Sequence, residues 1–511
     1  MTKTIIAQLF TKIETDGEVA AFIDKANEYS YYQLGNDIVE VAQKINQKEV
    51  KKGPIIVYGV NDYRALSVFL GANLSGHAYV PIDAHSPLER VKLIVEACEP
   101  AAIIITIPEI DLALKALFEN YSTLSLHDFD FKKKHDLTTV DISQAISGTQ
   151  INYIIYTSGT TGVPKGVAVS HDNLLTFTDW MINDFVPINN NQILSQAPFS
   201  FDLSIFSLYP SLLSGGTLVA LSREETLNFK VMFERLNRSV INTWISTPSF
   251  IDICLLDPSF TQENHSAMQQ FIFCGEELTI NTAQKLRQKF PAAVIWNTYG
   301  PTEATGAVTY TKITDEILKN YDRLPIGQAK SGVEIKIQDP ETKAFLPQGG
   351  RGEIVITGNS VALGYYKNPE KTAEAFFEVD GISAYHTGDA GLIDESGQLR
   401  YFGRLDFQVK FNGFRIELQD IEAHLTAIEG VEKSIVLPDY TSDNKVRRLV
   451  AVVQGETNAD ERAFTKYLKQ SLSERIMDYM MPSTFKYVDT FPLTQNGKID
   501  RKAITDIILG K

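Results

Sequence analysis

The sequence predicts a protein of two domains, a large one of α/β and a small one of α+β architecture. The chain has 511 residues, which is too long for one compact core and typical of at least two domains. Over most of the chain, short apolar segments of strand character alternate with helical segments, and this favours parallel sheets covered by helices. After Leu418 the order becomes helix, strand, strand, helix, strand, over about 100 residues, an ordinary domain size. We expect a large N-terminal domain over residues 1–405 and a small C-terminal domain over residues 406–511.

Individual segments support the large domain. Residues 54–59 form an apolar, β-branched run typical of a buried strand, and residues 63–74 have the pattern of a helix after it. Residues 101–106 are a further run of strand character. Residues 349–368 alternate in hydropathy and are punctuated by turn glycines, which indicates a small barrel or sheet within the large domain.

Composition narrows the possible functions. The formal net charge is −15, which disfavours binding to nucleic acid or to an anionic membrane, since both need a basic surface. The three cysteines, Cys98, Cys254 and Cys274, are odd in number and far apart, so they indicate neither a disulfide framework nor a zinc site. The sequence shows neither a secretory signal nor an apolar run long enough to span a bilayer. We therefore expect a cytoplasmic protein without membrane insertion or a nucleic-acid partner.

A loop rich in glycine and hydroxyl side chains follows a predicted buried strand at residues 153–156. Residues 157–166 read TSGTTGVPKG. Glycines let backbone N–H groups approach a phosphate closely, hydroxyls add neutral donors, and Lys165 adds a positive charge. The Gly-Lys-Ser/Thr ending of a Walker A loop is absent. A polar hairpin turn is the simpler alternative, but the ordered glycines and hydroxyls favour a phosphate-binding loop.

Asp202 places an acidic side chain in an apolar setting, within the sequence APFSFDLS at residues 197–204. A buried carboxylate is costly without a partner. One interpretation is that Asp202 caps the helix predicted after it. The other is that its carboxylate is the counter-ion of a substrate ammonium group, and we favour this second interpretation.

Two further segments carry groups suited to a nucleotide. In residues 296–305, which read WNTYGPTEAT, Tyr299 offers a flat face for a base and Thr302 a hydroxyl for a phosphate. Glu303 offers a hard carboxylate of the type that Mg²⁺ prefers. Asp389 follows a predicted Thr-Gly turn in the sequence YHTGD, and its carboxylate there can accept both ribose hydroxyls, although an Asx-type turn would use the same residue.

The order of these motifs resembles that of the adenylate-forming superfamily, which contains acyl-CoA synthetases, amino-acid adenylation domains and luciferases. The resemblance covers nearly the whole chain and includes residues 76–83 (GHAYVPID) and residues 403–410 (GRLDFQVK). It is greatest with the free-standing members that load D-alanine onto a carrier protein, because residues 273–277 read FCGEE. The resemblance implies a large adenylation domain and a mobile C-terminal domain.

The resemblance also implies a role for each matching residue. Lys498, on an Asn-Gly turn that would present it at a loop tip, is the implied catalytic residue, and Asp406 is the implied hinge. Glu303 is the implied Mg²⁺ ligand. The implied ATP-binding residues are Thr157, Ser158, Gly159, Thr160, Thr161, Lys165, Asn297, Thr298, Tyr299, Gly300, Pro301, Thr302, Asp389, Tyr401, Arg404 and Lys498. The implied D-alanine-binding residues are Asp202, Cys274, Gly306 and Lys498.

Cys274 has two interpretations. A free cysteine is usually a small buried hydrophobe. The alternative is that its side chain narrows the pocket for the acyl group. The sequence alone leaves both open.

The activity that the resemblance implies has two steps. ATP and Mg²⁺ convert D-alanine into D-alanyl-adenylate, and the D-alanyl group then passes to the phosphopantetheine thiol of a separate carrier protein, for D-alanylation of lipoteichoic acid. We expect a free-standing enzyme because no carrier domain follows Lys498. The alternatives are an L-amino-acid adenylating enzyme, an acyl-CoA synthetase and a nucleotide-binding regulatory protein. Asp202 argues against the second, and the joint presence of Glu303, Asp389 and Lys498 argues against the third.

Overall fold

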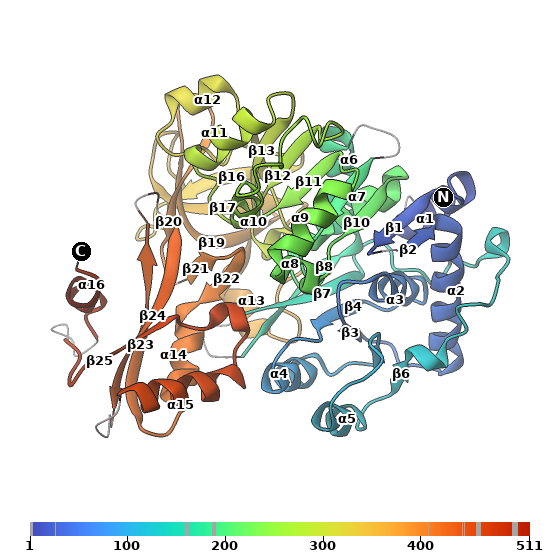
Figure 1. The fold of residues 1–511 in the computed structure, drawn as a ribbon, viewed down its shortest axis with the longest axis horizontal. Coiled ribbons are helices and arrows are strands. Elements are labelled where there is room, and N and C mark those ends of the chain that lie inside the picture. The colour runs from blue at the N-terminus through green and yellow to red at the C-terminus, as the bar shows by residue number, and fades with distance from the viewer. Residues whose placement is uncertain are drawn as a thin grey trace. The chain divides into compact units, whose positions relative to one another are not determined.

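The chain forms two compact units in the computed structural model. The structure describes residues 4–25, 27–158, 163–186, 191–406, 408–441, 443, 445–455, 461–492 and 499–510. Unit 1 comprises residues 1–85, 95–156 and 166–405, and unit 2 comprises residues 86–94, 157–165 and 406–511. Most of unit 2 is coloured orange to red in Figure 1.

The largest sheet of unit 1 carries the carboxyl-terminal strand ends on which the site is built. In the described part of the chain it has nine strands, in the order β15-β14-β13-β12-β11-β9-β10-β1-β2. Neighbouring strands from β13 to β1 are parallel, and β2, β14 and β15 pair in antiparallel fashion. The strands are β1 (Ala20–Asp24), β2 (Asn27–Ser30), β9 (Gln192–Ser195), β10 (Thr217–Ala220), β11 (Thr243–Ser246), β12 (Gln270–Phe273), β13 (Val294–Tyr299), β14 (Thr309–Lys312) and β15 (Gln328–Ala329).

A second sheet of six described strands has the order β6-β5-β3-β4-β7-β8. The pairs of β3 with β4 and β5, of β4 with β7, and of β5 with β6 are parallel. The strands are β3 (Ile55–Gly59), β4 (Tyr79–Asp83), β5 (Ala102–Ile105), β6 (Thr123–Ser125), β7 (Ile151–Thr157) and β8 (Lys165–Ser170). The strands predicted at residues 54–59 and 101–106 are therefore β3 and β5, and the expectation of parallel sheets is confirmed.

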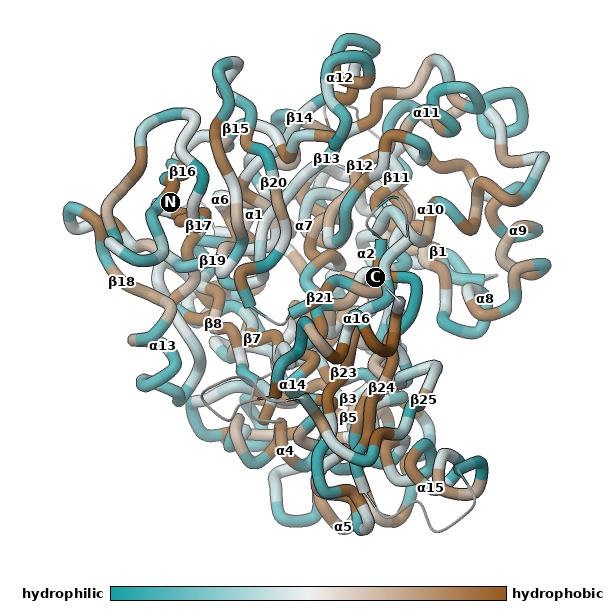
Figure 2. The backbone as a smooth tube through the Cα atoms, turned by 90° about the vertical axis from the view of Figure 1, so that its left-hand side faces the viewer, coloured by the Kyte–Doolittle hydropathy of each residue, from teal (hydrophilic) through white to brown (hydrophobic). Residues whose placement is uncertain are grey.

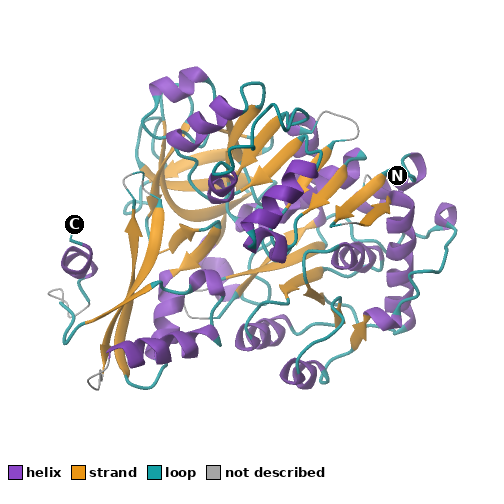
Figure 3. Ribbon diagram, viewed as in Figure 1, coloured by secondary structure: helices purple, strands orange, loops and turns teal. Residues whose placement is uncertain are grey.

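Helices cover these sheets, as the purple and orange elements of Figure 3 show. The helix predicted at residues 63–74 is α3, and it is buried along its length, as a helix between packed layers must be. The described helices up to residue 405 are α1 (Ile5–Thr15), α2 (Tyr31–Gln47), α3 (Tyr63–Leu74), α4 (Leu88–Cys98), α5 (Leu112–Phe118), α6 (His171–Phe185), α7 (Ile205–Ser214), α8 (Arg223–Leu227), α9 (Phe229–Arg238), α10 (Pro248–Cys254), α11 (Ile280–Lys289), α12 (Asp315–Asn320) and α13 (Pro369–Ala375).

A third, antiparallel sheet completes unit 1. It has the order β16-β17-β19-β18, and β20 pairs with β19. The strands are β16 (Val333–Gln338), β17 (Gly352–Gly358), β18 (Phe376–Val379), β19 (Ile382–Ile393) and β20 (Leu399–Arg404). This sheet is the small barrel or sheet predicted from residues 349–368, so the predicted class, helix-covered sheets with a small additional sheet, is confirmed.

Unit 2 has the predicted α+β composition. A hairpin of β21 (Gln408–Phe411) and β22 (Phe414–Glu417) precedes a sheet of β23 (Val431–Tyr440), β24 (Val446–Gly455) and β25 (Thr484–Tyr487). Its helices are α14 (Leu418–Thr426), α15 (Glu461–Ser473) and α16 (Arg501–Leu509). Successive residues of β23 point to opposite faces, because Val436 packs with α14 and α15, whereas Ile435 and Leu437 pack with Ile504 of α16. Figure 2 shows the hydrophobic colour along β23 and β24 that this burial on both faces requires.

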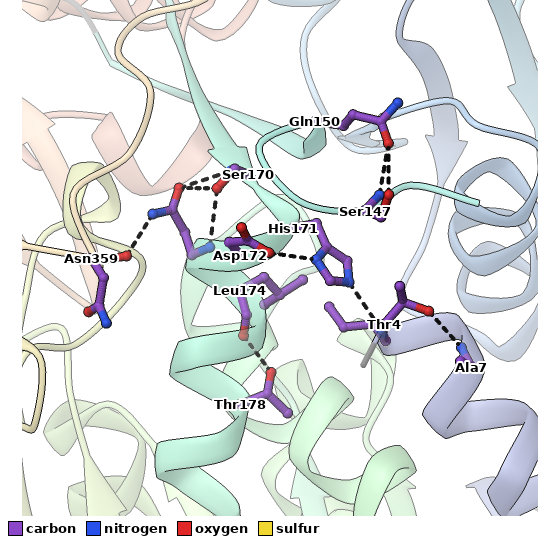
Figure 4. A network of polar contacts seen from close by, with 12 residues as sticks. Thr4, Ala7, Ser147, Gln150, Ser170, His171, Asp172, Leu174, Thr178 and Asn359 are labelled. Carbon is purple, nitrogen blue, oxygen red and sulfur yellow. Dashed lines mark hydrogen bonds and ion pairs between the residues drawn. The ribbon is translucent and has the colours of Figure 1, made fainter. Parts of the chain in front are cut away.

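A polar network fixes the N-terminal end of α6 (Figure 4). Ser170 and Asn173 form a capping box over the first turn of the helix. The N–H of Ile5 donates to Nε2 of His171 at 3.0 Å, and Nδ1 of His171 lies 3.2 Å from the carboxylate of Asp172. Because Nε2 accepts, the ring hydrogen is on Nδ1, and the hydrogen bond from Ile5 joins α1 to α6.

No helix in the described ranges combines the length and the apolar character needed to cross a membrane.

Candidate active site

The candidate site lies where neighbouring parallel strands of the nine-stranded sheet end. Asp202 follows β9, Cys274 follows β12 and the segment 300–306 follows β13. The carboxyl ends of adjacent parallel strands meet at one edge of a sheet, which is where open α/β sheets bind ligands. Residues that lie far apart in the sequence are therefore brought to one edge.

Asp202 is paired with Thr302. It is the first residue of a short 3₁₀ helix, η3 (Asp202–Ser204), and Phe201 occupies the cap position, so the alternative of a capping Asp202 is wrong. The Oγ1 of Thr302 donates to Oδ2 of Asp202 at 2.7 Å, and both residues are buried, Asp202 with 8% of its surface exposed. A buried carboxylate whose position is fixed in this way is suited to binding a cation.

Tyr153, on β7, adds a neutral phenol beside this carboxylate. Burial and, after it, the negative charge of Asp202 raise the pKa of Tyr153 well above its ordinary value, so the phenol stays protonated. Its hydroxyl is buried and has no hydrogen-bond partner among the described residues. We did not predict Tyr153 from the sequence, because it reads only as part of a buried strand.

Glu303 is completely buried, in the short 3₁₀ helix η4 (Thr302–Ala304). Its Oε1 accepts a hydrogen bond of 2.9 Å from the hydroxyl of Tyr365. A buried carboxylate needs such donors, because burial without them is costly. Tyr365 lies 62 residues further along the chain, and nothing in the sequence around it indicated this contact.

Asp389 is held by two predicted residues. The hydroxyl of Tyr299 donates to Oδ2 of Asp389, and Nη1 of Arg404 donates to Oδ1 at 3.0 Å. The same nitrogen of Arg404 donates to the carbonyl of Thr387 at 2.6 Å. Burial and, after it, the charge of Asp389 raise the pKa of Tyr299 well above its ordinary value, so Tyr299 remains a donor.

The prediction of a Thr-Gly turn at Asp389 is wrong. The residue lies inside β19, and the register between β17 and β19 shifts between Glu353 and Val355. Gly388 has a φ of +68°, which glycine adopts readily. The segment is therefore a bulge within a strand, and bulges commonly re-aim side chains beside functional sites.

Tyr401, on β20, stands between two fixed groups. Its ring centroid is 6.1 Å from that of Tyr299 and 5.2 Å from Cζ of Arg323. Arg323 is itself fixed by two hydrogen bonds to the carboxylate of Glu277, of 2.8 and 2.5 Å. Neither residue was predicted as a site residue: Glu277 lies in the FCGEE motif without an assigned role, and Arg323 lies in no motif.

The remaining predicted residues of segment 297–302 have structural contacts. Nδ2 of Asn297 donates to the carbonyl of Pro325, and Oγ1 of Thr298 donates to the carbonyl of Phe273, both at 2.8 Å. A Cβ at Gly300 would lie 2.6 Å from Cα of Ala307, so the chain passes too closely there for a side chain. Pro301 is the cap residue of η4. Their contacts with ATP stay predictions.

Cys274 and Gly306 are neighbours. The Sγ of Cys274 donates to the carbonyl of Gly306 over 3.8 Å, and the thiol is buried. Gly306 has a φ of +80°, and a Cβ there would lie 2.9 Å from Cε2 of Phe206. Thr305, before it, also has a positive φ of 58°, which is unfavourable for a β-branched residue and marks a tightly constrained turn.

Of the described residues of the predicted phosphate loop, residues 157, 158 and 163–165 belong to unit 2 and Gly166 belongs to unit 1. The Oγ of Ser158 donates to the carbonyl of Arg415 at 3.0 Å and accepts from the N–H of Glu417 at 3.4 Å. The Oγ1 of Thr157 donates to the carbonyl of Lys165 at 3.4 Å. The structure does not group the loop residues of unit 2 with Asp202, Glu303 or Asp389.

Several predicted residues lie outside the described residues, namely Gly159, Thr160, Thr161 and Lys498. The predicted hinge residue Asp406 is described, and its Oδ1 accepts from the N–H of Gln408 at 3.0 Å. The catalytic role of Lys498 and the hinge role of Asp406 stay predictions.

Comparison with known proteins places the chain in a family. Residues 9–366 match the AMP-binding enzyme family, and residues 420–498 match the AMP-binding enzyme C-terminal domain. The chain is 55% identical over 504 residues to the D-alanine–D-alanyl carrier protein ligase of Lactococcus lactis subsp. lactis, covering 98% of both chains. It is 43% identical over 514 residues to the ligase of the same name from Streptococcus agalactiae serotype V, covering 99% of this chain and 98% of the relative.

A solved structure shows the same fold. The Vibrio cholerae adenylation domain AlmE, in complex with glycyl-adenosine-5′-phosphate, superposes with a TM-score of 0.84 at 22% identity, covering 99% of this chain and 98% of that one. With two family models together spanning most of its length, the chain belongs to the AMP-binding enzyme family and, within it, to the family of the D-alanine–D-alanyl carrier protein ligases.

Proposed function

We propose that this protein is an ATP-dependent ligase that activates D-alanine as D-alanyl-adenylate and transfers the D-alanyl group to the phosphopantetheine thiol of a separate carrier protein. The relatives that are 55% and 43% identical carry the name of this activity, and their identity extends over nearly the full length of both chains. The observation that carries the proposal within the structure is the buried pair of Asp202 and Thr302, immediately beside Glu303.

The first step joins two anions. An oxygen of the D-alanine carboxylate attacks the α-phosphorus of ATP, a P–O bond forms, the bond to the bridging oxygen breaks, and pyrophosphate leaves. The barrier is largely a matter of holding the two anions together and in line. Asp202 binds the ammonium group, which places the carboxylate of a small amino acid a fixed distance from it.

The nucleotide is held by residues of β13, β19 and β20 and by Thr302. Asp389 presents a carboxylate that Tyr299 and Arg404 orient, and this suits the two hydroxyls of a ribose. Tyr299 keeps its proposed role as an aromatic face for the base, and Tyr401 lies beside it, next to Arg323. Thr302 can donate its hydroxyl to the α-phosphate in place of Asp202, whose carboxylate then meets the substrate ammonium.

Magnesium fits the donor set around Glu303. The described residues contain no cluster of three or more His, Cys, Asp or Glu that could enclose a metal ion. Mg²⁺ with nucleotides commonly takes one or two protein carboxylates, with phosphate oxygens and water as its other ligands. Glu303, buried and oriented by Tyr365, supplies such a carboxylate, and the bound ion would supply positive charge beside the pyrophosphate.

The second step transfers the acyl group. The thiolate of the carrier attacks the acyl carbon, a C–S bond forms, the C–O bond to AMP breaks, and AMP leaves. Lys498 is the proposed catalytic cation of the first step, and Asp406 is the proposed pivot of the small domain. The boundary between Leu405 and Asp406 supports domains over residues 1–405 and 406–511, although residues 86–94 and 157–165 group with residues 406–511. The product serves D-alanylation of lipoteichoic acid, and three free cysteines support a cytoplasmic location.

ATP–pyrophosphate exchange tests the proposal. We expect exchange to depend on D-alanine, to be slower with L-alanine and to be absent with short fatty acids. Faster exchange with an L-amino acid would instead assign the protein to L-amino-acid activation. Exchange with fatty acids alone would contradict the role of Asp202.

A further inference from the structure

Residues 359–366, called here the 359–366 segment, form hydrogen bonds both with β8 of the second sheet and with the turn that carries Glu303. The segment follows β17 and precedes α13. On one side, its residues 363–366 pair with residues 166–168 of β8 through backbone hydrogen bonds of 2.9, 3.0 and 2.7 Å. The segment is therefore fixed to a strand of the core rather than forming an unattached loop.

On its other side, the same segment holds the Glu303 turn. The N–H of Ala362 donates to the backbone carbonyl of Glu303 at 2.9 Å. The hydroxyl of Thr305 donates to the carbonyl of Ser360 at 2.8 Å, which fixes Thr305 in its positive-φ conformation. The hydroxyl of Tyr365 donates to the Glu303 carboxylate at 2.9 Å. Backbone and side chain of the segment thus hold both backbone and carboxylate of Glu303.

The start of α6 fixes the beginning of the segment. Nδ2 of Asn173 donates to the carbonyls of Asn359 and Val361, at 2.7 and 3.1 Å. Oδ1 of Asn173 accepts from the hydroxyl and the N–H of Ser170, at 2.6 and 3.1 Å. Figure 4 shows Ser170 and Asn359 in this network. Because both ends of the amide are bonded, its orientation is defined, and α6 cannot move without moving the segment.

We infer that Tyr365 is a positioning residue for the Glu303 carboxylate, and that Asn173 positions the segment that carries Tyr365. The inference rests on the proposed function, in which Glu303 binds Mg²⁺. A donor bonded to Oε1 fixes the plane of the carboxylate and therefore the direction of Oε2 toward a cation. Residues that orient a metal ligand in this way typically contribute 10- to 100-fold to metal affinity.

The hydroxyl of Tyr365 can be separated from the packing of its ring. The ring packs edge-on against Phe376, with centroids 5.3 Å apart and an interplanar angle of 85°. Tyr365→Phe keeps that contact and removes only the oxygen. Tyr366, the next residue, is half-buried and provides a matched control, since Tyr366→Phe removes the same group one position away.

The first test measures the Mg²⁺ requirement. In ATP–pyrophosphate exchange at saturating ATP and D-alanine, we expect Tyr365→Phe to raise the Mg²⁺ concentration for half-maximal rate about tenfold. The KM for D-alanine should change less than threefold, and Tyr366→Phe should behave like the parent protein. An unchanged Mg²⁺ requirement in Tyr365→Phe, or an equal change in both variants, would overturn the inference.

The second test does not use activity. The increase in melting temperature that ATP produces with Mg²⁺, compared with ATP alone, should shrink in Tyr365→Phe and persist in Tyr366→Phe. This comparison also separates the two proposals. If no amino acid supports pyrophosphate exchange by the parent protein, the proposed function fails. The Mg²⁺-dependent shift in melting temperature still reports whether Tyr365 acts on Glu303.

A third pair of variants tests Asn173. Asn173→Asp keeps an acceptor for Ser170 and removes both donations to the segment, whereas Ser170→Ala weakens the helix cap and leaves those donations in place. We expect Asn173→Asp to reproduce the raised Mg²⁺ requirement and Ser170→Ala to leave it within twofold. A raised requirement in Ser170→Ala alone would assign the effect to the stability of α6 and refute the positioning role.

Discussion

Replacing Asp202 by Asn tests the amino-acid site most directly. The two side chains have the same shape, and the amide oxygen of Asn can still accept the hydrogen bond of 2.7 Å from Thr302. The local fold should therefore persist, and the change removes the negative charge alone. Asp202 is 8% exposed, so the lost charge is one that solvent screens little.

The expected magnitude follows from this burial. Removing one partner of a buried, hydrogen-bonded charge pair costs about 2–5 kcal/mol. Asn retains one neutral hydrogen bond to the substrate ammonium, so we take about 3 kcal/mol, which corresponds to roughly a 150-fold loss. We expect this loss in kcat/KM for D-alanine, and a change of less than threefold in the KM for ATP.

The assay is ATP–pyrophosphate exchange with each substrate varied in turn. Asp315→Asn is the matched control, because it removes an equal charge from a side chain that is 86% exposed on α12. Equal losses for ATP and D-alanine in Asp202→Asn would refute the ammonium assignment. A loss as large in Asp315→Asn would show that net charge, rather than this carboxylate, is responsible.

Three further predictions concern a buried lysine, the acyl pocket and catalysis. Burial lowers the pKa of Lys330 from 10.5 to about 8, and its Nζ has no hydrogen-bond partner among the described residues. Between these values the unfolded chain binds more protons at this lysine than the folded chain, so the free energy of unfolding should rise with pH from about 8 to 10.5. Lys330→Met should stabilise the protein by about 3 kcal/mol at pH 7. A melting temperature no higher than that of the parent at pH 7, or an increase as large at pH 10.5 as at pH 7, would contradict this. Cys274→Ala removes the thiol beside the Gly306 carbonyl and should reduce the preference for D- over L-alanine severalfold in pyrophosphate exchange; an unchanged ratio would return Cys274 to the role of a small buried hydrophobe. Lys498→Ala should nearly abolish adenylate formation while ATP still raises the melting temperature, and unaltered exchange would refute its catalytic role.

The elements of the fold that could be predicted are those whose signal is local. The strand β3 and the helix α3 were predicted to within a residue. The first is a continuous apolar, β-branched run and the second has a helical pattern, and both are bounded by turn residues. The conformation around Asp389 was predicted wrongly as a turn. Gly388 there belongs to a bulge that depends on the pairing of β19 with β17 and β20, and strand pairing is not encoded within five residues.

Within the site, the sequence indicated which residues carry chemistry but not which contact each other. Asp202 was recognisable as an acid in an apolar setting, yet its partner Thr302 lies 100 residues away. Tyr365 gave no signal, because a tyrosine near a turn is common and its contact with Glu303 spans 62 residues. Arg323 was likewise invisible until the structure placed it beside Tyr401.

The sequence by itself determined the class of fold, the family and the chemical groups available, since periodicity, turn residues and motif order are properties of short stretches. Only the tertiary structure decided that Tyr299 and Arg404 orient Asp389 and that Tyr365 donates to Glu303. It also decided that Asn173 anchors the 359–366 segment, which carries Tyr365. The physical reason is that these hydrogen bonds join groups separated by 15 to 186 residues, and only the packing of strands and helices against one another brings such groups within bonding distance.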